Sequence, residues 1–167
     1  MVTIIDYGVG NLNSIKNMLK KIGIEAVISS TTADIESADK LILPGVGSFE
    51  YGMNKLRSSP FFDILQQKVL KNKTPILGVC LGAQLLLNGS EEGQPVPGLG
   101  WIEGKAIRFN QGKMADNYKV PHMGWNELQV KKESRLFTDM YNNQRYYFVH
   151  AYHMACYKEA DILAESN

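Results

Sequence analysis

The first half of the chain alternates short apolar runs with segments whose apolar residues recur every three or four positions. The apolar runs predict buried strands at residues 2–5, 26–28, 41–43 and 76–79. The recurring spacing predicts helices at residues 12–22, 61–70 and 81–87. Short strands alternating with helices are typical of βαβ units around a parallel sheet.

The pattern changes after Asn88 and Gly89, where glycine and proline cluster. Strand-like segments then follow at residues 105–109, 127–130 and 146–150 without helices between them, and residues 120–126 read as a loop. This half is therefore predicted to be mixed or antiparallel. The sequence indicates one α/β domain over residues 1–167, with a mostly parallel central sheet flanked by helices and an antiparallel portion in its second half.

Composition excludes several classes of protein. Hydrophobic residues make up 44% of the 167 residues and charged residues 21%, and the net charge is +1. These values are ordinary for a globular domain and give no reason to expect a nucleic-acid or membrane partner. The two cysteines form no disulfide framework, which fits a cytoplasmic protein. No Cys/His cluster has the spacing of metal ligands, so we expect no metal.

Cys80 lies in the pattern Gly78-Val79-Cys80-Leu81-Gly82, at the junction of a predicted strand and a predicted helix. With serine at its centre, the same pattern forms a nucleophile elbow, a strained turn that exposes the nucleophile. Cys80 is therefore the candidate nucleophile, and the backbone N–H of Leu81 is placed to stabilise an oxyanion. Cys156 has no such setting, and we expect it to be an inert, packed thiol.

Several longer motifs carry a family resemblance. The segment GVCLGAQLL resembles the nucleophile segment of class I glutamine amidotransferases. The segments IIDYGVGNLNS, LILPGVGSF, GLGWIEG, VPHMGWN and YYFVHAY resemble, in this order, the glutamine amidotransferase subunits of imidazole glycerol phosphate synthase. The resemblance extends from residue 3 to about residue 152.

This resemblance implies a flavodoxin-like fold and a glutaminase that needs no cofactor. Such a subunit hydrolyses L-glutamine to glutamate and ammonia through a cysteine thioester. It delivers the ammonia to a (β/α)8-barrel cyclase subunit that makes imidazole glycerol phosphate and AICAR in histidine biosynthesis. The two subunits form a heterodimer.

The resemblance also implies roles for individual residues. Cys80 matches the nucleophile, and the oxyanion donors match Val46, Gly47 and Leu81, with the Val46–Gly47 peptide able to flip. The positions that hold glutamine in the family are Gln84, Glu92, Ala151 and Tyr152. The positions that face the partner are Asn11, His122, Met123, Gly124, Trp125 and Tyr147.

The family activates its cysteine with a histidine that a glutamate orients, both in a segment resembling FHPEKS. The present sequence contains no His-Pro-Glu and ends at ADILAESN. We expect a chain that stops here to lack that segment, with the strand and final helix it supplies, and to be a weak glutaminase or none by itself.

Three alternatives remain open at this stage. Ammonia could feed surface-sugar biosynthesis instead of histidine biosynthesis. The protein could bind its barrel partner without hydrolysing glutamine. It could also be a different hydrolase with an elbow cysteine, although that reading leaves DYGVGNL and VPHMGWN unexplained.

Overall fold

The computed structural model describes residues 1–110, 120–138, 140 and 145–166. The helices are α1 Leu12–Lys21, α2 Thr32–Ser37, α3 Phe49–Arg57, α4 Phe62–Gln66 and α5 Leu81–Leu85, with a π-helical turn η1 Gln67–Lys71 and 3-10 turns η3 Arg135–Phe137 and η4 Glu159–Asp161. The strands are β1 Val2–Ile5, β2 Ala26–Ser29, β3 Lys40–Leu43, β4 Ile76–Gly78, β5 Gly89–Ser90, β6 Gly104–Arg108, β7 His122–Glu127, β8 Gln129–Val130, β9 Arg145–His150, β10 Tyr152–Cys156 and β11 Ala164–Glu165.

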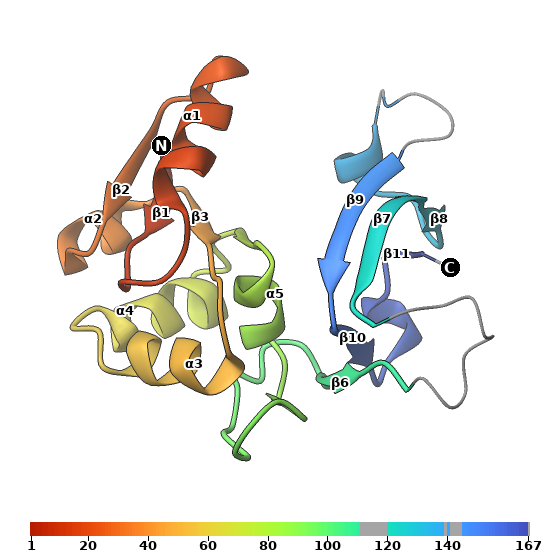
Figure 1. Ribbon diagram of the computed structural model, residues 1–167. Helices are drawn as coiled ribbons and strands as arrows, with labels where there is room; N and C mark the ends of the chain where they lie inside the picture. The colour runs from red at the N-terminus through yellow and green to blue at the C-terminus, as the bar shows by residue number, and fades with distance from the viewer. Residues whose placement is uncertain (111–119, 139, 141–144, 167) are drawn as a thin grey trace.

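The first half of the chain forms a parallel sheet with strand order β2-β1-β3-β4. Figure 1 shows this sheet with the helices α1 to α5 packed around it. The register pairs Leu43 at the end of β3 with Gly78 at the end of β4. The carboxyl ends of these strands therefore lie side by side, and the loops that leave them start from neighbouring points. The predicted α/β architecture is confirmed.

The hydrophobic core lies between this sheet and the helices that follow β3. Ile5 and Leu43 from the two central strands are fully buried, as are Met53 of α3, Leu65 of α4 and Leu85 of α5. Burial on both faces explains why the two central strands read as continuous apolar runs rather than as alternating patterns.

Polar caps fix where the helices begin after the loops. Asn11 accepts from the Ser14 N–H at the start of α1, and Ser48 caps α3 by accepting from the Tyr51 N–H. Each cap satisfies an N–H that has no partner within its helix. Helix α3, which the sequence analysis missed because its apolar stripe is short, begins directly after the loop that leaves β3.

Where the structure describes the second half, its strands pair antiparallel except β5 with β6, which agrees with the predicted mixed or antiparallel arrangement. Strand β6 pairs with β10 antiparallel and with β5 parallel, and β7 and β9 form a separate antiparallel ribbon. In Figure 1 the ribbon stands beside the parallel sheet, facing α5.

The prediction that residues 120–126 form a loop is wrong. Trp125 lies within β7, opposite Tyr147 of β9. Strand β7 contains Gly124 and no β-branched residue, so its own propensity for strand is weak. Pairing with β9, whose prediction is confirmed, overrides that propensity.

Some apolar side chains of the parallel half are exposed. Leu77 of the edge strand β4 is 51% exposed, and Met18 of α1 and Ile22 at its end are also exposed. Among the residues described here, no helix has the length and apolar character to cross a membrane.

Candidate active site

Cys80 lies at the turn between β4 and α5, as predicted. Its backbone has φ 55° and ψ −120°, a left-handed region that side chains other than glycine rarely adopt. Residues held in such strained conformations cluster at functional sites. The Cys80 side chain is exposed. A strained turn that presents a nucleophile to solvent at the end of a strand is the arrangement of a nucleophile elbow.

Both glycines of the elbow are needed for close backbone packing. A Cβ atom on Gly78 would lie 2.5 Å from the Ala83 Cα, and one on Gly82 would lie 1.9 Å from the carbonyl oxygen of Leu43. Neither distance is compatible with a side chain. The G-x-C-x-G pattern therefore reflects strand β4 and the carbonyl end of β3 packing directly against the first turn of α5.

The loop that leaves β3 lies against this elbow. A Cβ atom on Gly45 would lie 2.7 Å from the Gly82 N and 2.9 Å from the Leu81 Cβ, so Pro44 and Gly45 pack against the start of α5. Beyond Gly45 the loop turns outward, and Val46 and Gly47 are exposed. Gly47 has φ +95°, and nothing lies within 4 Å of the position of its Cβ. The structure thus brings Val46 and Gly47 to the loop beside Cys80.

The backbone N–H groups of Leu81, the residue after Cys80, and of Gly47, in the loop that leaves β3, lack an acceptor. Among the described residues, neither of the two donates a hydrogen bond. Unpaired donors around an exposed thiol are available to a negatively charged oxygen that forms during acyl transfer. Leu81 is the first residue of α5, directly after the Cys80 turn.

Gln84 lies close to Cys80 along the chain, and Glu92 lies close in space to the end of the loop that leaves β3. Gln84 belongs to α5, one turn after Cys80, and its N–H donates to the Cys80 carbonyl at 3.4 Å. The Glu92 carboxylate accepts from the Phe49 N–H at 2.8 Å, at the first residue of α3. Glu92 therefore anchors the far end of the loop that contains Gly47, a contact that the sequence did not predict.

Ala151 and Tyr152 lie on the second half of the chain. The Ala151 carbonyl accepts from the Phe109 N–H, and Tyr152 of β10 pairs with Arg108 of β6. In the described part of the chain, no hydrogen bond connects these two residues to the Cys80 turn.

The three histidines lie close together on one side of the β7–β9 ribbon, around Phe109. His122 Nδ1 lies 3.3 Å from His150 Nε2, and His150 Nδ1 lies 2.7 Å from the Tyr152 carbonyl oxygen. His153 stacks on Phe109 with ring centroids 4.7 Å apart. Burial, and then repulsion by His150, lowers the pKa of both His122 and His153. These half-buried imidazoles form a cluster with Phe109 in the second half of the protein.

The other face of the ribbon is exposed and apolar. Met123 and Trp125 of β7 and Tyr147 and Val149 of β9 are each more than half exposed. The register pairs Met123 with Val149 and Trp125 with Tyr147, and the rings of the latter pair meet edge-on at 5.6 Å. We call the four exposed side chains of Met123, Trp125, Tyr147 and Val149 the ribbon face. His122 and Gly124 occupy the alternate positions of β7, on the side of the ribbon where the histidines lie. Asn11, also expected to face the partner, is exposed at the start of α1.

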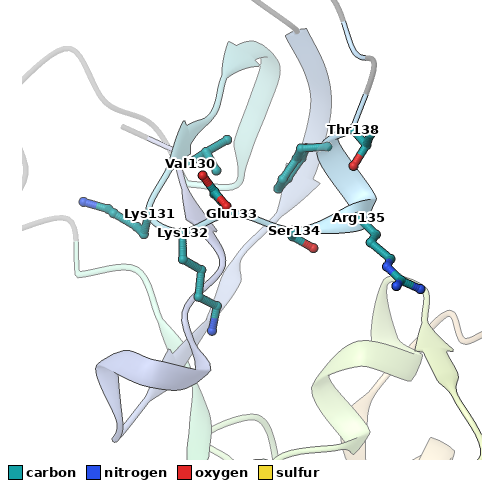
Figure 2. Close-up of a pocket in the computed structure, with 8 residues that line it drawn as sticks. Val130, Lys131, Lys132, Glu133, Ser134, Arg135 and Thr138 are labelled. Atoms are coloured by element: carbon teal, nitrogen blue, oxygen red, sulfur yellow. The ribbon is translucent and has the colours of Figure 1, made fainter.

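Two hollows elsewhere do not resemble binding sites. One of about 720 Å³ is lined by the segment from Val130 to Thr138. Its Lys131, Lys132 and Arg135 side chains point in different directions (Figure 2), and Lys131 pairs with Glu165 at 2.6 Å. A second, of about 470 Å³, is lined by Glu91, Arg108, Phe109, Asn110 and Val120.

Neither metal ligation nor a second reactive thiol has support in the described part of the chain. None of its groups of three or more His, Cys, Asp or Glu side chains is arranged to hold a metal ion. Cys156 is half-buried, and burial raises the pKa of its thiol. A raised pKa keeps the thiol protonated and unreactive.

Comparison with known proteins identifies what the chain resembles. Residues 3–167 match the family described as Glutamine amidotransferase class-I. "Imidazole glycerol phosphate synthase subunit HisH 2" of Methanococcus maripaludis is 48% identical over 163 residues, which cover 98% of this chain and 79% of that protein. The protein of the same name from Pseudomonas aeruginosa is 47% identical over 167 residues, which cover 100% of this chain and 81% of that protein.

Solved structures agree on the fold. One described as "Crystal structure of glutamine amidotransferase" superposes with a TM-score of 0.73 at 23% identity, covering 98% of this chain and 79% of that one. "Structure of PurLQS from Thermotoga maritima" gives a TM-score of 0.66 at 17% identity, covering 99% of this chain and 73% of that one. At these identities the superpositions support the architecture of the sheet and helices.

Proposed function

The chain belongs to the class-I glutamine amidotransferases, and from this premise we propose that it is the glutamine-hydrolysing subunit of an imidazole glycerol phosphate synthase. It hydrolyses L-glutamine to glutamate and ammonia, and the ammonia passes to a (β/α)8-barrel cyclase subunit. The names of its relatives support this function and favour histidine biosynthesis over the surface-sugar alternative. They also favour an active enzyme over a subunit that only binds its partner. A cytoplasmic location fits the two unpaired cysteines.

The proposed reaction centres on Cys80. Its thiolate attacks the side-chain amide carbon of glutamine, and the carbonyl oxygen becomes an oxyanion. When the oxyanion collapses, the carbon–nitrogen bond breaks and the amine leaves as ammonia with the proton that the thiol gave up. Water then attacks the γ-glutamyl thioester, which releases glutamate and restores the thiol.

The Leu81 N–H and the peptide between Val46 and Gly47 are the proposed oxyanion donors. Leu81 N–H is unpaired beside the thiol. The exposed Val46 and the open surroundings of Gly47 leave room for that peptide to rotate toward the oxyanion. Fixed donors that meet the charge where it develops stabilise such a transition state by about 3 kcal/mol each.

Gln84, Glu92, Ala151 and Tyr152 are the proposed glutamine contacts. Gln84 is one helical turn from Cys80, and the Glu92 carboxylate binds the N–H of Phe49 at the end of the loop that contains Gly47. A carboxylate suits the ammonium group of glutamine. Ala151 and Tyr152 complete the pocket only when β10 and the Cys80 turn approach a common ligand.

The ribbon face is the proposed docking surface for the cyclase, together with Asn11. Tryptophan and tyrosine bury a large rigid area and are favoured anchors of interfaces. Trp125 is 64% exposed and Tyr147 54%, although aromatic side chains of this size are usually well covered in a folded domain. Because His122 and Gly124 alternate to the opposite side, Met123 and Trp125 make the direct contacts.

The observation that carries the proposal is the exposed, strained Cys80 next to the unpaired N–H of Leu81. The test is glutamate release from glutamine by the complete gene product in complex with its cyclase. Cys80→Ala should abolish it, while the control Cys156→Ala should retain it. Glutamate release that survives Cys80→Ala would exclude Cys80 as the nucleophile.

A further inference from the structure

Tyr7 reaches from the end of β1 to the loop that leaves β3. Its side chain is only 5% exposed, and its hydroxyl donates to the Pro44 carbonyl oxygen at 2.6 Å. Pro44 is buried, and among the described residues it accepts from no donor other than Tyr7. Burial raises the pKa of the Tyr7 phenol, so the hydroxyl keeps its proton and donates.

The loop after β3 divides into fixed and free parts. At its start, Pro44 is held by Tyr7, and Gly45 packs against the first turn of α5. At its far end, the Phe49 N–H is held by Glu92 at 2.8 Å. Between them, Val46, Gly47 and Ser48 are exposed, and a Cβ atom on Gly47 would meet nothing within 4 Å.

We propose that Tyr7 is a positioning residue for glutamine hydrolysis, whose hydroxyl holds the Pro44 carbonyl so that rotation of the loop is confined to the Val46–Gly47 peptide. The inference rests on the proposed function, because it concerns the loop that supplies an oxyanion donor. With both ends fixed, rotation of one peptide moves its N–H toward Cys80 while the rest of the loop keeps its place.

The close packing explains why a hydroxyl is needed at this site. A Cβ atom on Gly45 would lie 3.0 Å from the Tyr7 oxygen, so the hydroxyl sits directly against the loop backbone. Phenylalanine would fill the same space but would leave a buried carbonyl without a donor. An unsatisfied carbonyl gains by turning toward water, and that rotation would shift Gly45 and the peptide after it.

The consequence is an effect on the reaction rather than on substrate binding. The Tyr7 hydroxyl bonds to Pro44 and the Glu92 carboxylate to Phe49, so loss of the hydroxyl breaks no hydrogen bond of Gln84 or Glu92, the two proposed glutamine contacts. A misplaced donor stabilises the transition state less while the ground state binds as before. Tyr7→Phe should therefore lower kcat about tenfold and leave KM for glutamine within about twofold.

The first experiment compares two labels of Cys80 in the complete gene product bound to its cyclase. A diazo-ketone analogue of glutamine needs both the pocket and the oxyanion donors, whereas iodoacetamide needs only an accessible thiol. Tyr7→Phe should slow labelling by the analogue about tenfold and leave labelling by iodoacetamide unchanged. The matched control is Tyr157→Phe, which removes the hydroxyl of an exposed tyrosine outside the site.

The outcomes separate this inference from the proposed function. If the wild-type protein reacts with iodoacetamide but not with the glutamine analogue, the proposed function is wrong. If the wild type reacts with the analogue and Tyr7→Phe reacts as fast, Tyr7 does not position the loop and the inference alone is overturned.

A second measurement distinguishes positioning from a general structural role. Amide hydrogen exchange should become faster at Gly45, which is buried in the wild type, when Tyr7 is replaced by phenylalanine, with exchange in β1 and β3 unchanged. If exchange rises throughout the sheet, or if the variant does not fold, the hydroxyl serves stability and the positioning role is excluded.

Discussion

At the scale of single residues, the site depends on where side chains are absent as much as on where they are present. The strained backbone of Cys80 costs about 1–3 kcal/mol, a cost that the surrounding packing must offset. Gly78 and Gly82 permit that packing, and their spacing around Cys80 made the elbow predictable from the sequence. The bond from Tyr7 to Pro44 was not predictable, because 37 positions separate the two residues and only the pairing of β1 with β3 brings them together.

Gly82→Ala should destabilise the fold. Its Cβ atom would lie 1.9 Å from the Leu43 carbonyl oxygen, so β3 and α5 must separate. We expect a loss of about 3 kcal/mol in the free energy of unfolding, measured by urea denaturation. The matched control is Gly89→Ala, whose Cβ atom would meet the Val96 carbonyl oxygen at an ordinary 3.6 Å. Equal stabilities of the two variants would contradict the packing described for the elbow.

At the scale of elements, the strands of the first half can be predicted from their own sequences more readily than strand β7 of the second half. Strands β1 and β3 are buried on both faces, so apolar runs identify them. Strand β7 alternates exposed and half-buried positions around Gly124, and only its pairing with β9 defines it. The ribbon then separates two kinds of surface, with aromatic anchors on one face and histidines on the other.

The histidine side of the ribbon should make stability depend on pH. Because burial lowers the pKa of His122 and His153 below the ordinary 6.5, the unfolded chain takes up protons more readily than the folded chain as the pH falls. The free energy of unfolding is therefore unaffected by protonation of these two histidines above pH 6.5, and it decreases as the pH falls below that value.

Thermal unfolding between pH 8 and pH 5 measures this dependence. His153→Phe keeps the stacking on Phe109 but removes one titrating group, so the midpoint should fall less steeply with acid than in the wild type. If the midpoint falls with the same slope in both proteins, titration of His153 does not contribute to the pH dependence of stability.

At the scale of the whole molecule, the residues of the proposed site come from both the parallel half and the antiparallel half. The Cys80 turn and the loop that leaves β3 lie next to each other because parallel strands end at one edge of the sheet. The sequence pattern predicted this arrangement. Ala151 and Tyr152 come from β10 and its preceding turn, and their place relative to Cys80 depends on how the two halves pack, which no local pattern encodes.

The ribbon face should govern assembly with the cyclase. Trp125→Ala should weaken binding about 30-fold, since truncating a central aromatic anchor costs about 2 kcal/mol. Isothermal titration with the cyclase of the same organism measures this. Leu136→Ala is the control, because Leu136 is as exposed as Trp125, at 64%, but lies outside the ribbon face. Equal affinities of both variants and the wild type would place the docking surface elsewhere.

The measurement that tests the central claim most directly is mass spectrometry of the acid-quenched reaction. The complete gene product, bound to its cyclase, is mixed with glutamine, quenched during turnover and digested. The account predicts one glutamyl group on the peptide that contains Cys80 and none on the peptide that contains Cys156, because only Cys80 is an exposed thiol on a strained turn. Release of glutamate with no glutamyl group on Cys80, or with the group on Cys156, would contradict it.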